Sequence, residues 1–268
     1  FSTGGRHLIP PEMSVACIVL GAAAVGAYLV HARRTPAPVL RLSLLGIPTF
    51  RASVLGGSLF RIGVGAIPFL LPLMLQVGFG LNPLESGLLT FIAAIGAIFT
   101  KALAKRVLEM VGFRRLLTVN AVIGSFFVAA NGFFAPDTPH WLIMAVLFIG
   151  GCFRSLQFTS LNALGYAEVS DREMSYATSL ASAVQQLALG MGVAVGAFAL
   201  ESSALLRGSD GLAAGDFAPA FWLVAGISAL SGLVFARLDP SAGAEMSGHQ
   251  TVKAGSPSTG MGDGTDSR

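Results

Sequence analysis

The feature that most constrains the fold of this chain is a series of apolar runs long enough to cross a lipid bilayer. A transmembrane helix needs roughly 20 apolar residues, with a range of about 17–25. Seven runs satisfy this condition, at residues 14–30, 53–78, 86–104, 116–134, 141–163, 178–200 and 219–236. Only helices or closed barrels satisfy backbone groups in lipid, and these runs do not alternate. The sequence therefore predicts an all-α membrane protein with seven transmembrane helices.

The charge content supports this class of protein. Charged residues make up 12% of the 268 residues and hydrophobic residues 53%, whereas soluble domains carry about 25% charged residues. Cys17 and Cys152 lie inside apolar runs, and none of the four histidines does. Metal and haem sites depend on clusters of such ligands. The sequence therefore predicts no metal site and no cofactor.

Lysine and arginine gather in alternate gaps between the runs. Of the 17 basic residues, 13 lie in the first, third and fifth gaps or after the last run, and the opposite side carries only Arg6 and Arg207. Because basic loops remain in the cytoplasm, we expect the chain to begin outside and to end inside.

Three regions are predicted along the chain. Residues 1–51 would form an outer segment, an extra transmembrane helix and a cytoplasmic linker, and residues 52–240 a six-helix bundle. Residues 241–268 are rich in Gly, Ser and Thr, which predicts a disordered cytoplasmic tail. The first residues, FSTGGRHLIPPEM, lack an initiator Met and a signal-peptide pattern. We therefore expect the chain to be a fragment of a longer protein.

Acidic residues avoid the centres of the apolar runs. None of the 14 Asp and Glu residues lies there, and Glu85 and Glu201 stand only at the ends of runs. Proton-driven transport needs a carboxylate or histidine that titrates within the membrane, and hydrolysis needs acids or histidine beside a nucleophile. The pattern argues against an enzyme, and it places any proton site on a part outside this chain.

Two arginines do lie within apolar runs, Arg61 and Arg154. An arginine at a helix centre costs about 2.5–3.5 kcal/mol on insertion scales, so facing lipid would gain nothing. We expect both side chains to face the bundle interior or a wet cavity, with snorkelling to an interface as the alternative. Gln157, Thr159 and Asn162 follow Arg154 and predict a polar cavity wall there.

The next run carries a polar face of its own. Ser175, Ser179, Ser182 and Gln186 recur at helical spacing, with Gln185 beside them. These residues either bond neighbouring helices or line the same cavity. Gly190, Gly192 and Gly196 predict close helix contacts in this run.

The second run contains two prolines and a glutamine near its outer end. Pro68 and Pro72 predict a kink. Gln76 would line an outer vestibule or sit at the membrane interface.

Three segments together resemble one transporter family. PFLLPLMLQVGFGLNPLESGLLT resembles a helix–loop–helix of the fourteen-helix drug–proton antiporters (EmrB/QacA-like) of the major facilitator superfamily. RSLQFTSLNALGYAEVSDREMSYATSLASAVQQLALGMGVAVGA is similar to their late helices. KRVLEMVGFRR is similar to the superfamily's loop motif Asp-Arg-x-Gly-Arg-Arg. Glu109, Gly112 and Arg114 match that motif in type, whereas Met110 and Phe113 replace two of its arginines.

The resemblance implies an architecture and an activity. The last six helices would form the C-terminal bundle of the superfamily, a 3+3 inverted repeat, and the first would be one of two extra central helices. The protein would export small lipophilic or amphiphilic molecules by alternating access in a bacterial cytoplasmic (inner) membrane. A proton gradient would drive export, and the N-terminal half of the same transporter would complete the cavity. The cavity residues would be drawn from the polar positions in the runs: Arg61, Gln76, Arg154, Gln157, Asn162, Gln185 and Gln186.

Other classes remain to be weighed against this one. A seven-helix receptor has the right number of spans, but a retinal protein needs a lysine in the last run, which APAFWLVAGISALSGLVF lacks. An exporter of an anionic metabolite or siderophore within the same superfamily is the stronger alternative, because an arginine inside the membrane suits an anion.

Overall fold

The computed structural model describes residues 11–35, 39–208, 211–240 and 242–243. In this part of the chain, helices account for all of the regular structure, and six are long and apolar enough to cross a membrane. Three short 3-10 helices belong to the connections in the described residues: Leu42–Gly46, Asn131–Phe133 and Ala214–Asp216. The main helices are α1 (Pro11–Arg34), α2 (Pro48–Leu73), α3 (Pro83–Val111), α4 (Phe113–Ala130), α5 (His140–Tyr166), α6 (Met174–Leu206) and α7 (Phe217–Ala236).

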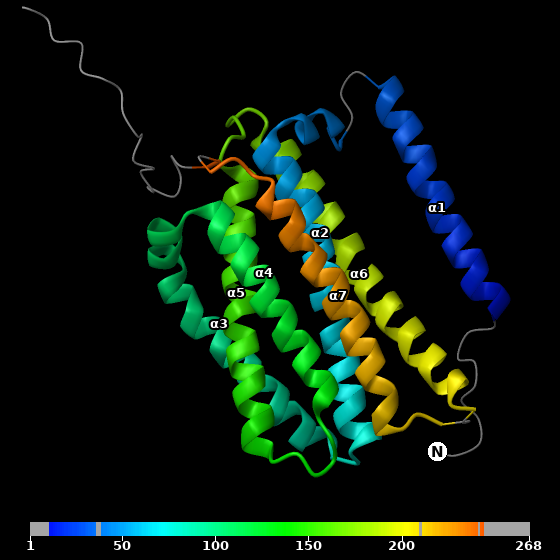
Figure 1. Ribbon diagram of the computed structural model, residues 1–268. Coiled ribbons are helices and arrows are strands. Elements are labelled where there is room, and N and C mark those ends of the chain that lie inside the picture. The colour runs from blue at the N-terminus through cyan, green and yellow to red at the C-terminus, as the bar shows by residue number, and fades with distance from the viewer. Residues whose placement is uncertain (1–10, 36–38, 209–210, 241, 244–268) are drawn as a thin grey trace, which may run out of the picture.

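The first predicted span differs from the other six. It falls within α1, whose apolar part, Val19–Ala32, is shorter than the six spans. Figure 1 shows α1 standing apart from the bundle formed by α2 to α7. The six-helix membrane bundle predicted from the sequence is therefore confirmed. Most of the predicted tail, residues 244–268, lies outside the described residues.

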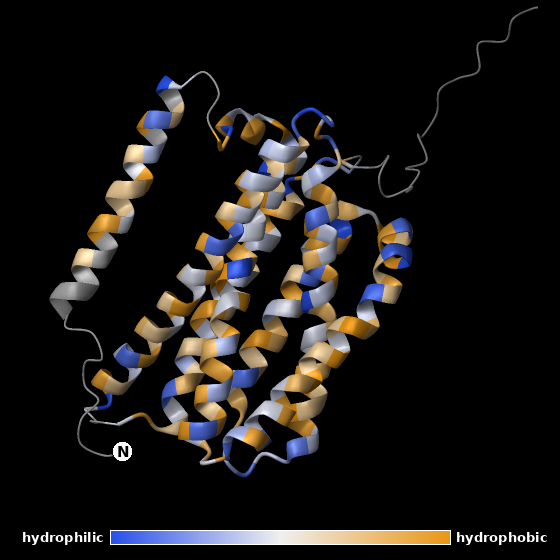
Figure 2. Ribbon diagram, turned by 180° about the vertical axis from the view of Figure 1, so that it is seen from behind, coloured by the Kyte–Doolittle hydropathy of each residue, from blue (hydrophilic) through white to orange (hydrophobic). Residues whose placement is uncertain are grey.

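The helices alternate in direction through the bundle. The start of α2 and the α3–α4 and α5–α6 turns lie at one end, and the α2–α3, α4–α5 and α6–α7 turns lie at the other (Figure 1). The first of these ends holds the basic gaps of the sequence, including Lys105, Arg115 and Arg172. Figure 2 shows hydrophobic residues along the helices and hydrophilic ones gathered towards both ends, with a few between.

Two pairs of helices cross through glycines. At the α2–α6 crossing, a Cβ on Gly192 would overlap the carbonyl oxygen of Ile62, and one on Gly65 would lie 2.6 Å from the carbonyl oxygen of Leu189. At the α3–α5 crossing, a Cβ on Gly96 would overlap the carbonyl oxygen of Phe148, and one on Gly151 that of Ala93. Small residues let helix backbones approach closely in membranes. The predicted close contact at Gly192 is confirmed, whereas Gly190 has no atom near its Cβ position.

The two crossings share one register. In each of the four helices, the residue whose carbonyl meets the partner glycine lies three positions before that helix's own glycine. Helix α5 therefore packs against α3 in the same way that α2 packs against α6, and Gly151 is equivalent to Gly65. Equivalent helices of the two units are three positions apart in chain order. Because successive helices alternate in direction, equivalent helices run in opposite directions across the bundle. This is the arrangement of an inverted repeat, α2–α4 against α5–α7.

The C-terminal part of α2 departs from a regular α-helix. Pro72 lies inside the helix, which gives way at Met74 to a π-helical turn, Met74–Gly78. Proline has no N–H to continue the helical hydrogen bonds, and π-turns interrupt helices at such places. A capping box then starts α3: the Asn82 side chain accepts from the Glu85 N–H at 2.9 Å, and the Glu85 carboxylate accepts from the Asn82 N–H at 3.2 Å.

Candidate functional site

A cavity of about 280 Å³ lies inside the bundle, between α2, α3, α4 and α5. Its walls are mostly apolar, and the polar groups on them come from Thr90, Asn131 and Arg154. Gly124 of α4 is buried on this wall, yet no atom lies within 4 Å of its Cβ position. The main apolar lining residues are Phe60, Val64, Ile67, Phe127, Val146 and Leu147.

A second pocket, of about 590 Å³, lies between α2, α5 and α6. It shares three residues with the inner cavity, Val64, Pro68 and Arg154, and adds Phe158 and Gln186. Arg154 therefore lies where the two meet. Drug-sized sites have the same character, since they are mostly apolar with a few placed polar groups.

Arg154 is half-buried in this position. Among the described residues, none forms a hydrogen bond or an ion pair with its guanidinium. No acid lies at the centre of α2 to α7, so the described part of the bundle offers no carboxylate at this depth. A guanidinium carries five N–H donors, and these remain available to a bound molecule.

Arg61 has very different surroundings. Its side chain is 5% exposed, and Nη2 donates a hydrogen bond to Asn162 Oδ1 at 3.4 Å. The guanidinium lies 5.6 Å from the centre of the Phe158 ring, a cation–π distance. On another side, a Cβ on Gly57 would lie 2.5 Å from Nη1. Arg61 and Asn162 thus line a small pocket of about 10 Å³ and stand outside the two larger cavities.

Gln157 lies in a helix contact. Its side chain is fully buried, and its Oε1 accepts a hydrogen bond from Asn120 Nδ2 at 2.6 Å. Its Nε2 donates to the Leu117 carbonyl at 3.3 Å, and Asn120 Nδ2 also donates to the Phe153 carbonyl at 2.9 Å. The pair joins α5 to α4. Asn120 is not among the residues predicted from the sequence, although a lone Asn in the run TVNAVIG was a visible signal.

The remaining glutamines are spread over three places. Gln76 is half-buried at the π-turn, where its Nε2 donates to Ser86 Oγ at 3.4 Å and joins α2 to α3. Gln186 is exposed on the wall of the larger pocket. Gln185 is half-buried and is not among the residues lining either cavity. Of the residues predicted to line a cavity, Arg154 and Gln186 come together on one wall.

The loop motif lies at the α3–α4 turn. Gly112 has φ +76°, a backbone conformation that favours glycine, and it links the two helices directly. Glu109 forms an ion pair with Lys105 at 3.9 Å on the surface. Arg114 is exposed, and its side chain has no hydrogen bond or ion pair among the described residues.

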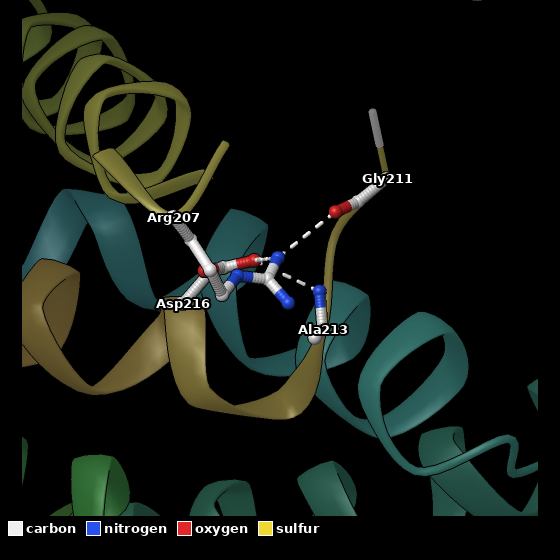
Figure 3. A network of polar contacts seen from close by, with 4 residues as sticks. All are labelled: Arg207, Gly211, Ala213 and Asp216. Carbon is white, nitrogen blue, oxygen red and sulfur yellow. Dashed lines mark hydrogen bonds and ion pairs between the residues drawn. The ribbon is translucent and has the colours of Figure 1, made fainter. Parts of the chain in front are cut away.

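The α6–α7 turn is closed by an ion pair between an exposed arginine and a buried aspartate. Figure 3 shows Arg207, after the end of α6, reaching Asp216, which is 2% exposed at the start of α7. Arg207 Nη2 also donates to the Gly211 carbonyl at 2.9 Å, and the Ala213 N–H donates to Asp216 at 2.8 Å. This network fixes the turn, so Arg207 is a structural residue.

These features define the chain as a multi-pass membrane protein with an internal apolar cavity. Residues 53–257 match the Major Facilitator Superfamily. The chain belongs to this superfamily, which places it among membrane transporters and not among enzymes. In the described residues, no group of three His, Cys, Asp or Glu side chains could hold a metal ion.

Three bacterial relatives carry the name "Putative multidrug resistance protein MdtD". The protein of Pectobacterium atrosepticum is 31% identical over 240 residues, which are 88% of this chain and 52% of the relative. That of Pectobacterium carotovorum is 33% identical, over 72% of this chain and 41% of the relative. The Cronobacter sakazakii protein is 32% identical, over 83% and 48%. The chain thus spans about half the length of these relatives.

Proposed function

We propose that this chain is the C-terminal half of a proton-coupled exporter of small molecules. The observation that carries the proposal is the position of Arg154, an unpaired cation where an inner apolar cavity meets a larger pocket. Such a cavity binds apolar and amphiphilic molecules, and the cation orients them. The names of the relatives, which refer to multidrug resistance, support export as the direction of transport.

The partner of this bundle would be a second bundle of the same transporter. Within the described residues, α2, α5 and α6 bound the larger pocket, and a second bundle would cover its open side. The chain covers about half of its relatives. A fourteen-helix transporter of the EmrB/QacA-like type would supply seven further spans, with α1 as one of its extra central helices.

Transport would follow alternating access, in which two bundles rock around a site near the bilayer midplane. The described spans hold no acid at their centres, so the proton would bind in the other half. The bundle would cross the inner membrane of a bacterium, with its basic end and the tail on the cytoplasmic side.

The test is export by the complete gene product in a bacterial strain that lacks its main efflux pumps. Accumulation of a panel of neutral, cationic and anionic fluorescent compounds would be measured with and without a protonophore. We expect expression to lower accumulation of at least one compound, and the protonophore to restore it. Unchanged accumulation of every compound would contradict the proposed export function. Export that continues in the presence of the protonophore would contradict proton coupling.

A further inference from the structure

We propose that the preferred ligands of the cavity are small monoanions with an apolar tail. The carboxylate, or a similar anionic head, would bind Arg154, and the tail would fill the inner cavity. This inference rests on the proposed function, because it names the class of molecule that the exporter would carry.

The charge of the bundle favours an anion. Two arginines lie within its apolar spans, and the described spans place no acid at their centres. The hydrogen-bond partner of Arg61 is the neutral amide of Asn162, which leaves that positive charge in place. Charges interact more strongly away from water, because the effective dielectric constant is lower there. The described bundle would therefore repel a cationic ligand and attract an anionic one.

The geometry at Arg154 favours a head group with two or more oxygens. A guanidinium is a planar fork of donors that binds carboxylates and phosphates through two parallel hydrogen bonds. The Arg61 fork lies against Gly57 and Phe158, which leaves it little room for a ligand. Arg154 lines both cavities, and its fork has no partner among the described residues.

The inner cavity favours a tail of limited length. Its volume of about 280 Å³ equals the share of roughly nine liquid water molecules. Buried Gly124 leaves part of this space empty, with no atom within 4 Å of its Cβ position. Each methylene transferred from water to such a site strengthens binding about fourfold. An eight-carbon acid such as octanoate is therefore a suitable probe.

The first experiment measures equilibrium binding to the complete purified protein in lipid nanodiscs. Octanoate, octanol and octyltrimethylammonium share one tail and differ in charge. We expect octanoate to bind at least tenfold more tightly than the other two. Arg154→Gln should weaken octanoate at least tenfold and change octanol less than twofold, whereas Arg154→Lys should retain part of the preference. Equal binding of the three ligands, or unchanged octanoate binding in Arg154→Gln, would overturn the proposal.

A second variant tests the tail and leaves the charge in place. Gly124→Leu fills open space on the cavity wall, and we expect it to weaken octanoate at least tenfold. The matched control is Gly226→Leu on α7, where the glycine is exposed, also has open space, and lines neither cavity. This control should bind octanoate as the native protein does. Native octanoate affinity in Gly124→Leu would show that the tail lies elsewhere.

Export assays separate this inference from the function on which it rests. Export of neutral or cationic compounds without any preference for octanoate would contradict the proposed preference for anions. It would still support the proposed export function. Octanoate binding that depends on Arg154, in a protein that exports nothing, would overturn the exporter and leave the anion site standing.

Discussion

The two helix crossings of this bundle have the same backbone packing and carry different polar residues. Gly65 and Gly151 occupy equivalent places at the α2–α6 and α3–α5 crossings. Counting from these glycines, Arg154 on α5 corresponds to Pro68 on α2. Arg61 on α2 corresponds to Leu147 on α5. The symmetry therefore covers the close packing and stops at the charged side chains.

This difference separates the positions that maintain the fold from those that form the candidate site. The glycines must be alike because any larger residue would meet a backbone carbonyl. The lining positions have no such constraint, since they face open space. As a result, one wall of the inner cavity carries the cation and the other carries a proline. A binding site with one charged end is the consequence.

The largest expected effect concerns the crossings themselves. Gly192→Leu and Gly96→Leu should each destabilise the bundle by about 3 kcal/mol or more, because the new side chain overlaps a backbone carbonyl. The measurement is the yield of monodisperse protein and its thermal midpoint in detergent. Gly190→Leu, with open space at its Cβ position, is the control and should fold. Similar losses at both crossings are expected, and a loss at only one would contradict their equivalence.

The next effect concerns the connection that closes the second repeat. Asp216→Ala leaves Arg207 without its carboxylate and removes the acceptor of the Ala213 N–H. We expect a loss of about 2 kcal/mol, which is the range for hydrogen bonds to a charged group. Thermal unfolding of the purified variant checks this value. An unchanged midpoint would mean that the ion pair does not hold the α6–α7 turn.

A smaller effect should come from the amide pair between α4 and α5. Asn120→Leu leaves the buried Gln157 without one partner and should cost about 1–2 kcal/mol. Gln157→Leu places on α5 the residue that α2 carries at the equivalent position, Leu71. The double variant should cost less than the sum of the single variants, because no unpaired amide remains. Additive losses in thermal unfolding would show that the two side chains act independently.

The smallest effect is expected at the α3–α4 end, which corresponds to the α6–α7 end in the other repeat. Lys105 and Glu109 form an exposed pair at 3.9 Å. Lys105→Ala should change stability by less than about 0.5 kcal/mol, because surface ion pairs are screened by water. A loss as large as that of Asp216→Ala would mean that the two connections carry equal charge networks.

The spans of the bundle could be predicted from the sequence, whereas the directions of their side chains could be predicted only in part. The six bundle helices lie where the apolar runs predict them. Gln157 and Asn162 were both assigned to the cavity wall with Arg154, but they lie in different contacts. On an α-helix Asn162 is displaced by about 80° from Arg154, whereas Gln157 is displaced by about 60° in the opposite sense. Because the two residues are close to Arg154 in the sequence, they were predicted to lie on one cavity wall, although they lie on different faces of the helix.

By itself, the sequence determined the class of protein, the six spans of the bundle and their alternating direction. It also predicted a seventh span at residues 14–30, which falls in α1, whose apolar part is shorter than the six spans. Length, apolar content and the placement of basic residues are properties of single segments, and the bilayer acts on each segment separately. Only the tertiary structure decided which arginine is enclosed and which borders a cavity. Arg61 and Arg154 stand in equally apolar runs, and their roles depend on helices distant in the chain. Gly57, Phe158 and Asn162 enclose the first, while the second faces space left between α2, α3, α4 and α5.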